Sequence, residues 1–118
     1  KKRIFYDANW ELTNPENSKY YRVYSDFDSI SKTYKINSYY TSNNQLQWSG
    51  NVQNNNPEAT NCESAICEGE SNWYNEDGTP SSKSNYLEGR RHGKSILYFR
   101  NGESMVFNYD RGKYLKKK

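Results

Sequence analysis

The sequence predicts an all-β protein, built as one antiparallel sheet of successive β-hairpins with at most one short helix near the N-terminus. Residues 69–78 (GESNWYNEDG) return as residues 93–102 (GKSILYFRNG), with both glycines and the tyrosine displaced by 24 residues. The segment at 85–89 (NYLEG) returns at 108–112 (NYDRG), displaced by 23 residues. A fixed period of this length indicates a repeat architecture. Each unit also contains an Asp-Gly or Asn-Gly pair, which is typical of hairpin turns.

The composition agrees with a thin sheet and one domain, spanning residues 1–118. Hydrophobic residues make up 32% of the chain, and this count includes 12 tyrosines and 3 tryptophans. With so few aliphatic side chains, the core has to be built largely from aromatic rings that have one polar edge. A sheet with a wet face suits such rings better than a thick globule does.

Residues 1–38 are expected to form N-terminal hairpins and the short helix. Residues 3–12 read as two short strands around a turn at Asp7 and Asn9. Residues 13–20 contain a capping-box pattern that begins at Thr13 and has a proline early, which predicts one or two helical turns. Residues 20–24 alternate as a strand does, and residues 31–37 are the returning strand.

Residues 39–52 form a degenerate repeat. The spacing from Tyr40 to Asn44 equals the spacing from Tyr74 to Gly78, and asparagine is the residue best able to replace glycine at positive φ. Residues 53–68 break the period and contain a run of asparagines before Pro57, so we interpret them as an inserted loop.

Residues 69–115 form two well-matched repeats. We expect type I′ turns at Asp77-Gly78 and at Asn101-Gly102, because both pairs tolerate positive φ. Gly89, Gly93 and Gly112 are expected to mark the turns between hairpins. Stacking of the hairpins should bury aromatic and aliphatic side chains of the two units against each other, namely Trp73, Tyr74, Leu97 and Tyr98.

Cys62 and Cys67 are separated by four residues, a spacing that permits a small disulfide loop. Free thiols remain the alternative. A zinc site is disfavoured because structural zinc usually takes four ligands, and the chain has one distant histidine. A disulfide would indicate an oxidising compartment.

Neither the charges nor the titratable residues indicate an enzyme. The net charge is +3, and lysines and arginines gather at the two ends, so we expect no nucleic-acid partner. His92 lies in a repeat turn, where a structural role is expected. Asp26 and Asp28 do not have the spacing of a calcium loop and are expected to serve a turn. We therefore expect no catalytic residues, no cofactor and no bound metal, and no apolar run is long enough to span a membrane.

The run from Gly69 to Gly93 has an aromatic pair, an Asp-Gly turn, a second tyrosine and a Gly-Arg-Arg-His-Gly ending. It resembles the repeat of bacterial MORN-variant proteins, many of which are labelled antitoxin components of the YwqK type. The resemblance covers residues 20–112. It implies a β-hairpin repeat sheet with a role in interaction or scaffolding, and it carries no catalytic residues. In that family the signature residues are structural, and here they are Gly69, Tyr74, Gly78, Tyr86, Gly89, Gly93, Tyr98 and Gly102.

The resulting hypothesis is a non-catalytic module for protein–protein interaction or scaffolding, including an antitoxin-like or immunity-like role. An envelope-associated protein that binds lipid head groups or carbohydrate is the alternative. Export with a leader absent from this chain is expected, with a cytoplasmic location as the other possibility. Exposed aromatic and arginine side chains have the composition of an interaction hot spot, and the candidates are Tyr39, Trp48, Arg90, Arg91 and Tyr114.

Overall fold

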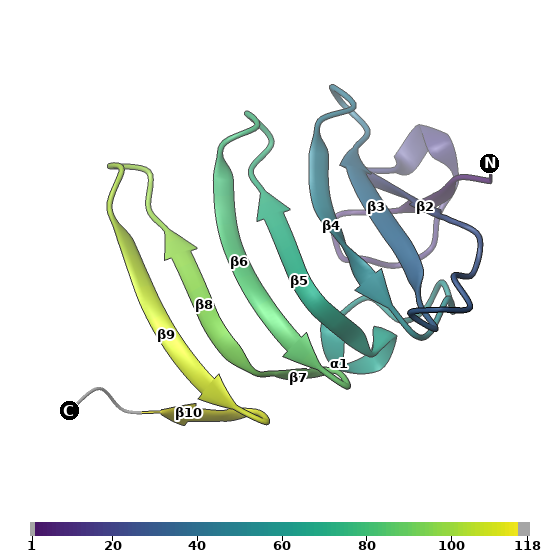
Figure 1. The fold of residues 1–118 in the computed structure, drawn as a ribbon. Helices are drawn as coiled ribbons and strands as arrows, with labels where there is room; N and C mark the ends of the chain where they lie inside the picture. Colours follow the sequence, from purple (N-terminus) through teal and green to yellow (C-terminus); the bar gives the residue numbers. More distant parts are fainter. Residues whose placement is uncertain (1, 116–118) are drawn as a thin grey trace.

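The computed structural model describes residues 2–115 and shows one antiparallel sheet whose strands follow one another in chain order (Figure 1). Strands β7 and β8 both pair with β6, and the other strands pair with their sequence neighbours. The predicted all-β hairpin fold is therefore confirmed. The strands are β1 (Ile4–Tyr6), β2 (Tyr20–Tyr24), β3 (Tyr34–Tyr40), β4 (Leu46–Val52), β5 (Cys67–Tyr74), β6 (Pro80–Leu87), β7 (Arg90–Arg91), β8 (Gly93–Tyr98), β9 (Ser104–Asp110) and β10 (Lys113–Leu115).

The N-terminal part differs from the expectation in its boundaries. The return from β1 is a single bridge between Tyr6 and Leu12 instead of a second strand. Strand β3 begins at Tyr34 and runs without a break through residues 38 and 39, where repeat matching placed a boundary. Its length follows from pairing with β2 on one side and β4 on the other.

The expected N-terminal helix is one 3-10 turn, η1 (Pro15–Asn17), and its cap is not Thr13. The Oδ1 atom of Asn14 accepts a hydrogen bond from the backbone N–H of Asn17 at 3.0 Å. Proline at the first helical position makes the preceding residue the cap. The turn ends at Asn17 because the chain enters β2 soon afterwards.

A second helical element, α1 (Cys62–Ala65), lies inside the segment that sequence analysis treated as an inserted loop. Asn61 and Ser64 form a capping box, in which the side chain of each residue accepts a hydrogen bond from the backbone N–H of the other. Ile66 ends the helix with a φ of 57°. Cys67 and Glu68 already belong to β5, so the segment outside the sheet is residues 53–66.

The hydrophobic core lies between this segment and strands β3–β5. Ile36, Trp48 and Val52 from the sheet pack against side chains of residues 53–66, with Trp73 and Tyr86 at the margin. Trp48 is 3% exposed and stacks on Trp73 with ring centroids 6.0 Å apart. The segment is therefore the cover of the core, and the core is partly aromatic as the composition predicted.

The predicted type I′ turns occur, but at the opposite end of the hairpins. Glu88 and Gly89 both have positive φ, 50° and 83°, and they connect Leu87 directly to its partner Arg90. Arg111 and Gly112 repeat this geometry with φ of 46° and 91°. Two-residue loops with positive φ at both positions have the right twist for a tight hairpin.

At Asp77-Gly78 and Asn101-Gly102 the type I′ prediction is wrong, because only the glycines have positive φ. The Oδ1 atoms of Asp77 and Asn101 accept hydrogen bonds at 3.0 Å from the N–H two residues later. Such a side-chain bond closes a longer loop in which the first residue keeps an ordinary φ. Asn43 makes the same bond at 3.0 Å beside Asn44, whose φ is 59°, so the degenerate repeat retains the turn geometry.

A buried arginine holds the N-terminal half together. Arg22 has no exposed surface and donates through Nη1 to the carbonyl oxygen of Ala59 at 2.9 Å. Its guanidinium carbon lies 4.8 Å from the ring centroid of Tyr6 and 5.4 Å from that of Trp48. Within residues 2–115 no carboxylate pairs with it, so aromatic faces replace a counter-ion.

Replacing Arg22 should show how much of this stabilisation comes from packing. Arg22→Ala should lower the free energy of unfolding by about 3 kcal/mol, because it leaves a cavity and an unbonded carbonyl. Arg22→Met fills most of the volume and removes the cost of burying the charge, so about half of that loss is expected. Urea denaturation followed by tryptophan fluorescence measures both. Equal losses for the two variants would contradict a packing role.

The Asp77 turn should respond to acid. The hydroxyl of Thr79, the backbone N–H of Thr79 and the Arg100 guanidinium lower the pKa of Asp77 to about 2. A depressed carboxyl pKa stabilises the fold above the ordinary value of 3.8, and this contribution is lost as the pH falls towards 2. A ¹³C NMR titration should show this pKa, and Thr79→Val should raise it more than Arg100→Gln does. An Asp77 carboxyl that titrates near 3.8 would refute the assignment.

Candidate binding groove

A row of small side chains crosses the middle of one sheet face, which we call the groove face. Gly50 lies against Ser71, so close that an added Cβ would come 2.4 Å from the Ser71 Oγ atom. Ser71 pairs with Ser84, and Ser95 continues the row on β8 by the register of β6 with β8. The three serines are 0%, 4% and 7% exposed.

Two rows of larger side chains flank the serines. On one side Trp73 pairs with Ser82, and Ser82 pairs with Leu97. On the other side Tyr86 pairs with Arg91, and the Arg91 guanidinium carbon lies 5.5 Å from the ring centroid of Tyr109. The serine row is therefore a floor between two walls that run across the strands.

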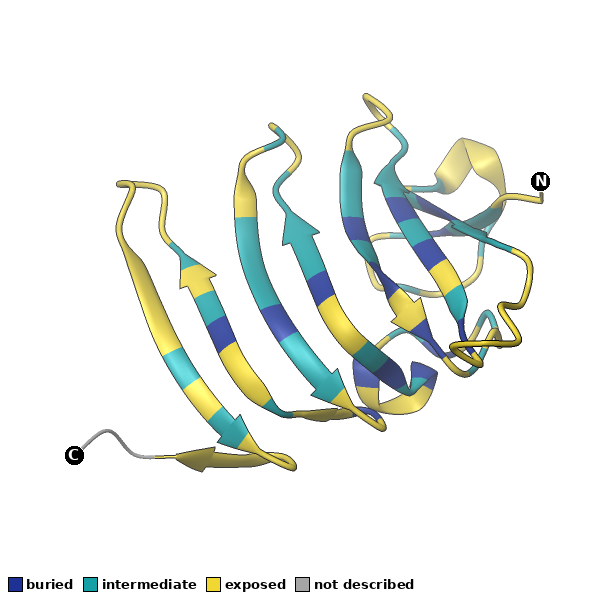
Figure 2. Ribbon diagram, viewed as in Figure 1, coloured by how far each residue is buried: buried dark blue, intermediate teal, exposed yellow. Residues whose placement is uncertain are grey.

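The same face is covered in one half of the sheet and open in the other. Residues 53–66 cover it over β3–β5, whereas buried bands become rarer towards β9 (Figure 2). The open part forms a groove of ≈ 450 Å³ between Trp73 and Phe107. A second hollow of ≈ 530 Å³ shares Trp73, Tyr86, Arg91 and Tyr109 with it and reaches Asn61 on the cover. We refer to the two together as the groove.

Arg91 is the cation that both sections of the groove share. Burial alone would lower its pKa, but the phenol groups of Tyr86 and Tyr109 outweigh burial and raise it above the ordinary value, so the side chain stays charged. The section between Trp73 and Phe107 is lined by no described carboxylate, histidine or thiol. This section offers apolar and aromatic surface, serine and tyrosine hydroxyls and one fixed positive charge.

The five residues predicted as an interaction surface do not lie together. Arg91 and Tyr114 lie near Tyr109, which contacts the Tyr114 ring at a centroid distance of 5.7 Å. Tyr39 lies on the other face, stacked on Tyr21 at 5.0 Å. Strand alternation separates these two groups.

Trp48 and Arg90 require separate comment. The prediction for Trp48 as a surface contact is wrong, because cross-strand pairing with Trp73 and the cover of residues 53–66 bury it. Arg90 is exposed beside the turn at Gly112, and it lines the far end of the groove.

The structural repeat residues lie in turns and strands, but Gly93, expected in a turn between hairpins, is the first residue of β8 and pairs with Tyr109. Gly69, Gly78, Gly89, Gly93 and Gly102 all have positive φ, and Tyr74, Tyr86 and Tyr98 lie half-buried in strands. The side chains of the two units were expected to be buried against each other, and the structure differs from this expectation. Strand β6 lies between β5 and β8, so Trp73 and Leu97 flank Ser82 without stacking, and Leu97 remains 41% exposed.

Sequence reasoning did not single out Tyr86, Leu97, Phe107 and Tyr109 as lining residues. The signal was present in the repeat itself. Leu97 is the repeat equivalent of Trp73 at an offset of 24, and Tyr109 is that of Tyr86 at 23. Combining the offsets with strand alternation would have assigned both walls to one face.

His92 has the structural role that its turn position predicted. Its Nδ1 atom accepts a hydrogen bond at 3.1 Å from the backbone N–H of Arg111. One repeat earlier, the Oε1 atom of Glu68 accepts from the N–H of Glu88 at 3.1 Å. The two side chains cap equivalent type I′ turns. The Oδ1 atom of Asp28 likewise serves a turn by accepting from the N–H of Ile30 at 2.9 Å.

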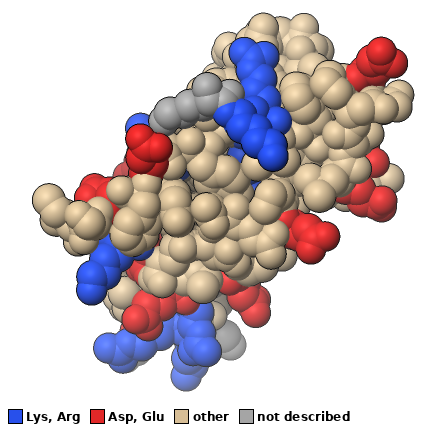
Figure 3. Space-filling view, turned by 90° about the vertical axis from the view of Figure 1, so that its right-hand side faces the viewer, with Lys and Arg blue, Asp and Glu red and all other residues tan. Residues whose placement is uncertain are grey.

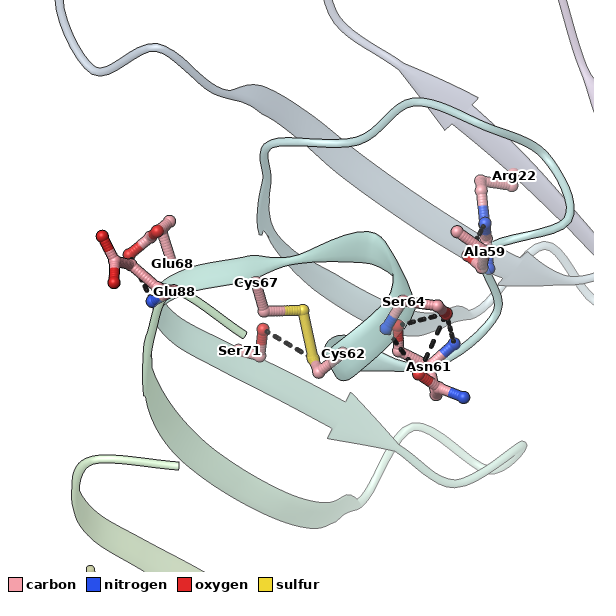
Figure 4. The surroundings of a disulfide bond; sticks show 9 residues. All are labelled: Arg22, Ala59, Asn61, Cys62, Ser64, Cys67, Glu68, Ser71 and Glu88. Carbon is pink, nitrogen blue, oxygen red and sulfur yellow. Dashed lines mark hydrogen bonds between the residues drawn. A yellow bond between two sulfur atoms is a disulfide. The ribbon is translucent and has the colours of Figure 1, made fainter. Parts of the chain in front are cut away.

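A disulfide joins Cys62 to Cys67 and fastens the cover to the first residue of β5 (Figure 4). Cys67 is fully buried and Cys62 is 8% exposed. The Cys62 sulfur also lies 4.0 Å from the hydroxyl of Ser71, at the start of the serine row. The disulfide therefore anchors the cover beside the closed end of the groove.

Outside the groove the surface carries charges of both signs. Figure 3, which shows the N-terminal side, has separate basic and acidic groups on a mainly neutral surface. The described chain contains no group of three or more potential metal ligands. Within residues 2–115, neither helical element has the length and apolar character needed to cross a bilayer.

Comparison with protein-family models finds no match for this chain, and searches of curated proteins and of solved structures find no significant similarity. The resemblance to MORN-variant repeats thus rests on the residues quoted above, and the function is argued from the groove.

Loss of the disulfide should loosen the cover. A Cys62→Ala, Cys67→Ala double variant should lower the free energy of unfolding by about 2 kcal/mol, as expected for closure of a short loop. Urea denaturation measures the loss, and wild-type protein treated with a reductant should match the variant. Two alkylatable thiols in the wild-type protein under non-reducing conditions would contradict the disulfide.

Proposed function

We propose that this chain is a non-catalytic binding module whose protein partner inserts a short segment into the groove. The observation that carries the proposal is an open row of half-buried aromatic rings and one arginine over a buried serine floor. Tryptophan, tyrosine and arginine are the residues in which binding energy concentrates at protein interfaces. Half-buried rings supply contact area at a low cost in side-chain entropy.

The dimensions favour a segment over a whole flat interface. The open part of the face crosses β6, β8 and β9, so two strand spacings give a length of about 10 Å. That length accommodates about three extended residues. An antitoxin-like or immunity-like role, as the repeat resemblance implies, would be one form of such binding.

The buried disulfide favours an oxidising location, such as the cell envelope or the exterior, for this module. In that setting the cover stays fastened while the groove remains open to a partner. A scaffold for other envelope proteins is compatible with the same geometry.

A selection of random 12-residue peptides displayed on phage tests the proposal. Peptides enriched on the wild-type protein should bind at least about tenfold more weakly to Leu97→Ser, which removes one exposed wall residue. Val106→Ser is the matched control, because Val106 pairs with Ile96 on the other face and is 49% exposed. Fluorescence polarisation measures both affinities. Absence of enriched peptides, or equal losses for both variants, would refute a groove-directed binding role.

A further inference from the structure

Arg91 has no acidic partner within the part of the chain that the structure describes. Two exposed cations elsewhere are paired: Lys83 lies 3.7 Å from Glu70, and Arg100 lies 2.9 Å from Asp77. Arg22 is enclosed completely and donates to a backbone carbonyl. Arg91 instead borders open space, with one side of its guanidinium over the Tyr109 ring.

The Arg91 guanidinium lies over the Tyr109 ring. A guanidinium presents its donors in a planar fork that matches a carboxylate. A neighbouring hollow shares Arg90 with the groove and is lined by Arg90, Arg111 and Lys113 against Glu63 and Glu88, so the surface beside the groove has excess positive charge. The charge is complementary to an anionic ligand.

The rest of the lining favours a peptide over a carbohydrate. A sugar needs many hydrogen-bond partners around an aromatic platform. The floor hydroxyls of Ser71, Ser84 and Ser95 are at most 7% exposed, so they are not available to a hydroxyl-rich ligand. The accessible lining combines apolar side chains such as Trp73 and Leu97 with polar groups at Asn75, Ser82 and Arg91. An extended peptide, which carries apolar and polar groups along its length, matches this mixture.

We propose that the groove binds an extended acidic peptide segment, in which an Asp or Glu carboxylate pairs with Arg91. A neighbouring apolar or aromatic side chain lies over the serine floor between the walls. Further acidic residues of the segment extend towards the basic end at Arg90 and Arg111. This inference rests on the proposed function, because it specifies the chemistry of the segment that the groove binds.

The test uses fluorescein-labelled 12-residue peptides obtained from the phage selection, each synthesised with Glu or Asp and with the Gln or Asn counterpart. At one acidic position of the peptide, replacing the carboxylate side chain by its amide counterpart should weaken binding to the wild-type protein by at least about tenfold. The same change should matter less than about threefold for Arg91→Gln, because the coupled pair is already broken. Arg91→Lys should lie between the two.

Lys94→Gln is the matched control, since it removes one cation from β8 on the opposite face and should preserve the full amide effect. Thermal unfolding of each variant shows that the fold is retained. Should Arg91→Gln fail to fold, Arg91→Lys provides the test. An intermediate affinity and a reduced amide effect for Arg91→Lys would support the inference, and an unchanged amide effect would overturn it.

The outcomes separate this inference from the proposed function. Peptides that lose affinity for Leu97→Ser but show no amide effect at any acidic position would overturn the acidic segment and leave the binding role intact. Absence of any groove-bound peptide would overturn both. Binding of hexagalacturonic acid at Arg91 without any peptide binding would assign the charge to a carboxylated sugar and would also overturn the inference.

Discussion

The row of small side chains across the middle of the groove face is the constraint on which the rest of the structure depends. Gly50 and the serines cannot by themselves shield the backbone of the sheet, so larger neighbours or another segment must cover them. Over β3–β5 the cover is residues 53–66, fastened by the disulfide. Over β6–β9 the flanking rings cover the serines from the sides and leave a groove. The core and the groove thus lie on the same face of the sheet, which is covered in one half and open in the other.

The repeated turn geometry keeps the strands of the covered half and of the open half in the same register. In the two well-matched units, a two-residue type I′ turn lies at one side of the sheet and a loop closed by an Asp or Asn side chain lies at the other. The turns of both kinds bring equivalent residues of successive units to the same face, because one extra residue would invert every side chain. The walls of the groove therefore consist of repeat-equivalent residues that lie on the same side of the sheet.

Two arginines show how cover changes the role of a side chain. Arg22 lies under the cover, where three aromatic rings and a carbonyl enclose it and it serves stability. Arg91 lies on the same face beyond the cover, where the Tyr109 ring supports it and it borders the groove. The difference arises from the position of residues 53–66, since the two side chains are chemically identical.

Much of the fold could be read from the chain. The period, the paired glycines and the aromatic composition specify hairpins, strand order and an aromatic core, because turn chemistry and alternation act over a few residues. The site was harder to foresee. Tyr86 and Tyr109 are equivalent by repeat offset, but their joint position with Arg91 required the cross-strand register. Trp48 looked like a surface residue because nothing local reveals that a distant segment will cover it.

By itself, the sequence determined the repeating hairpins, the positive-φ glycines of the turns and the closeness of Cys62 to Cys67, since each depends on neighbours within one unit. The tertiary structure alone decided which half of the groove face is closed and which is open. That outcome depends on where residues 53–66 pack, a contact between residues far apart in the chain that no local pattern encodes.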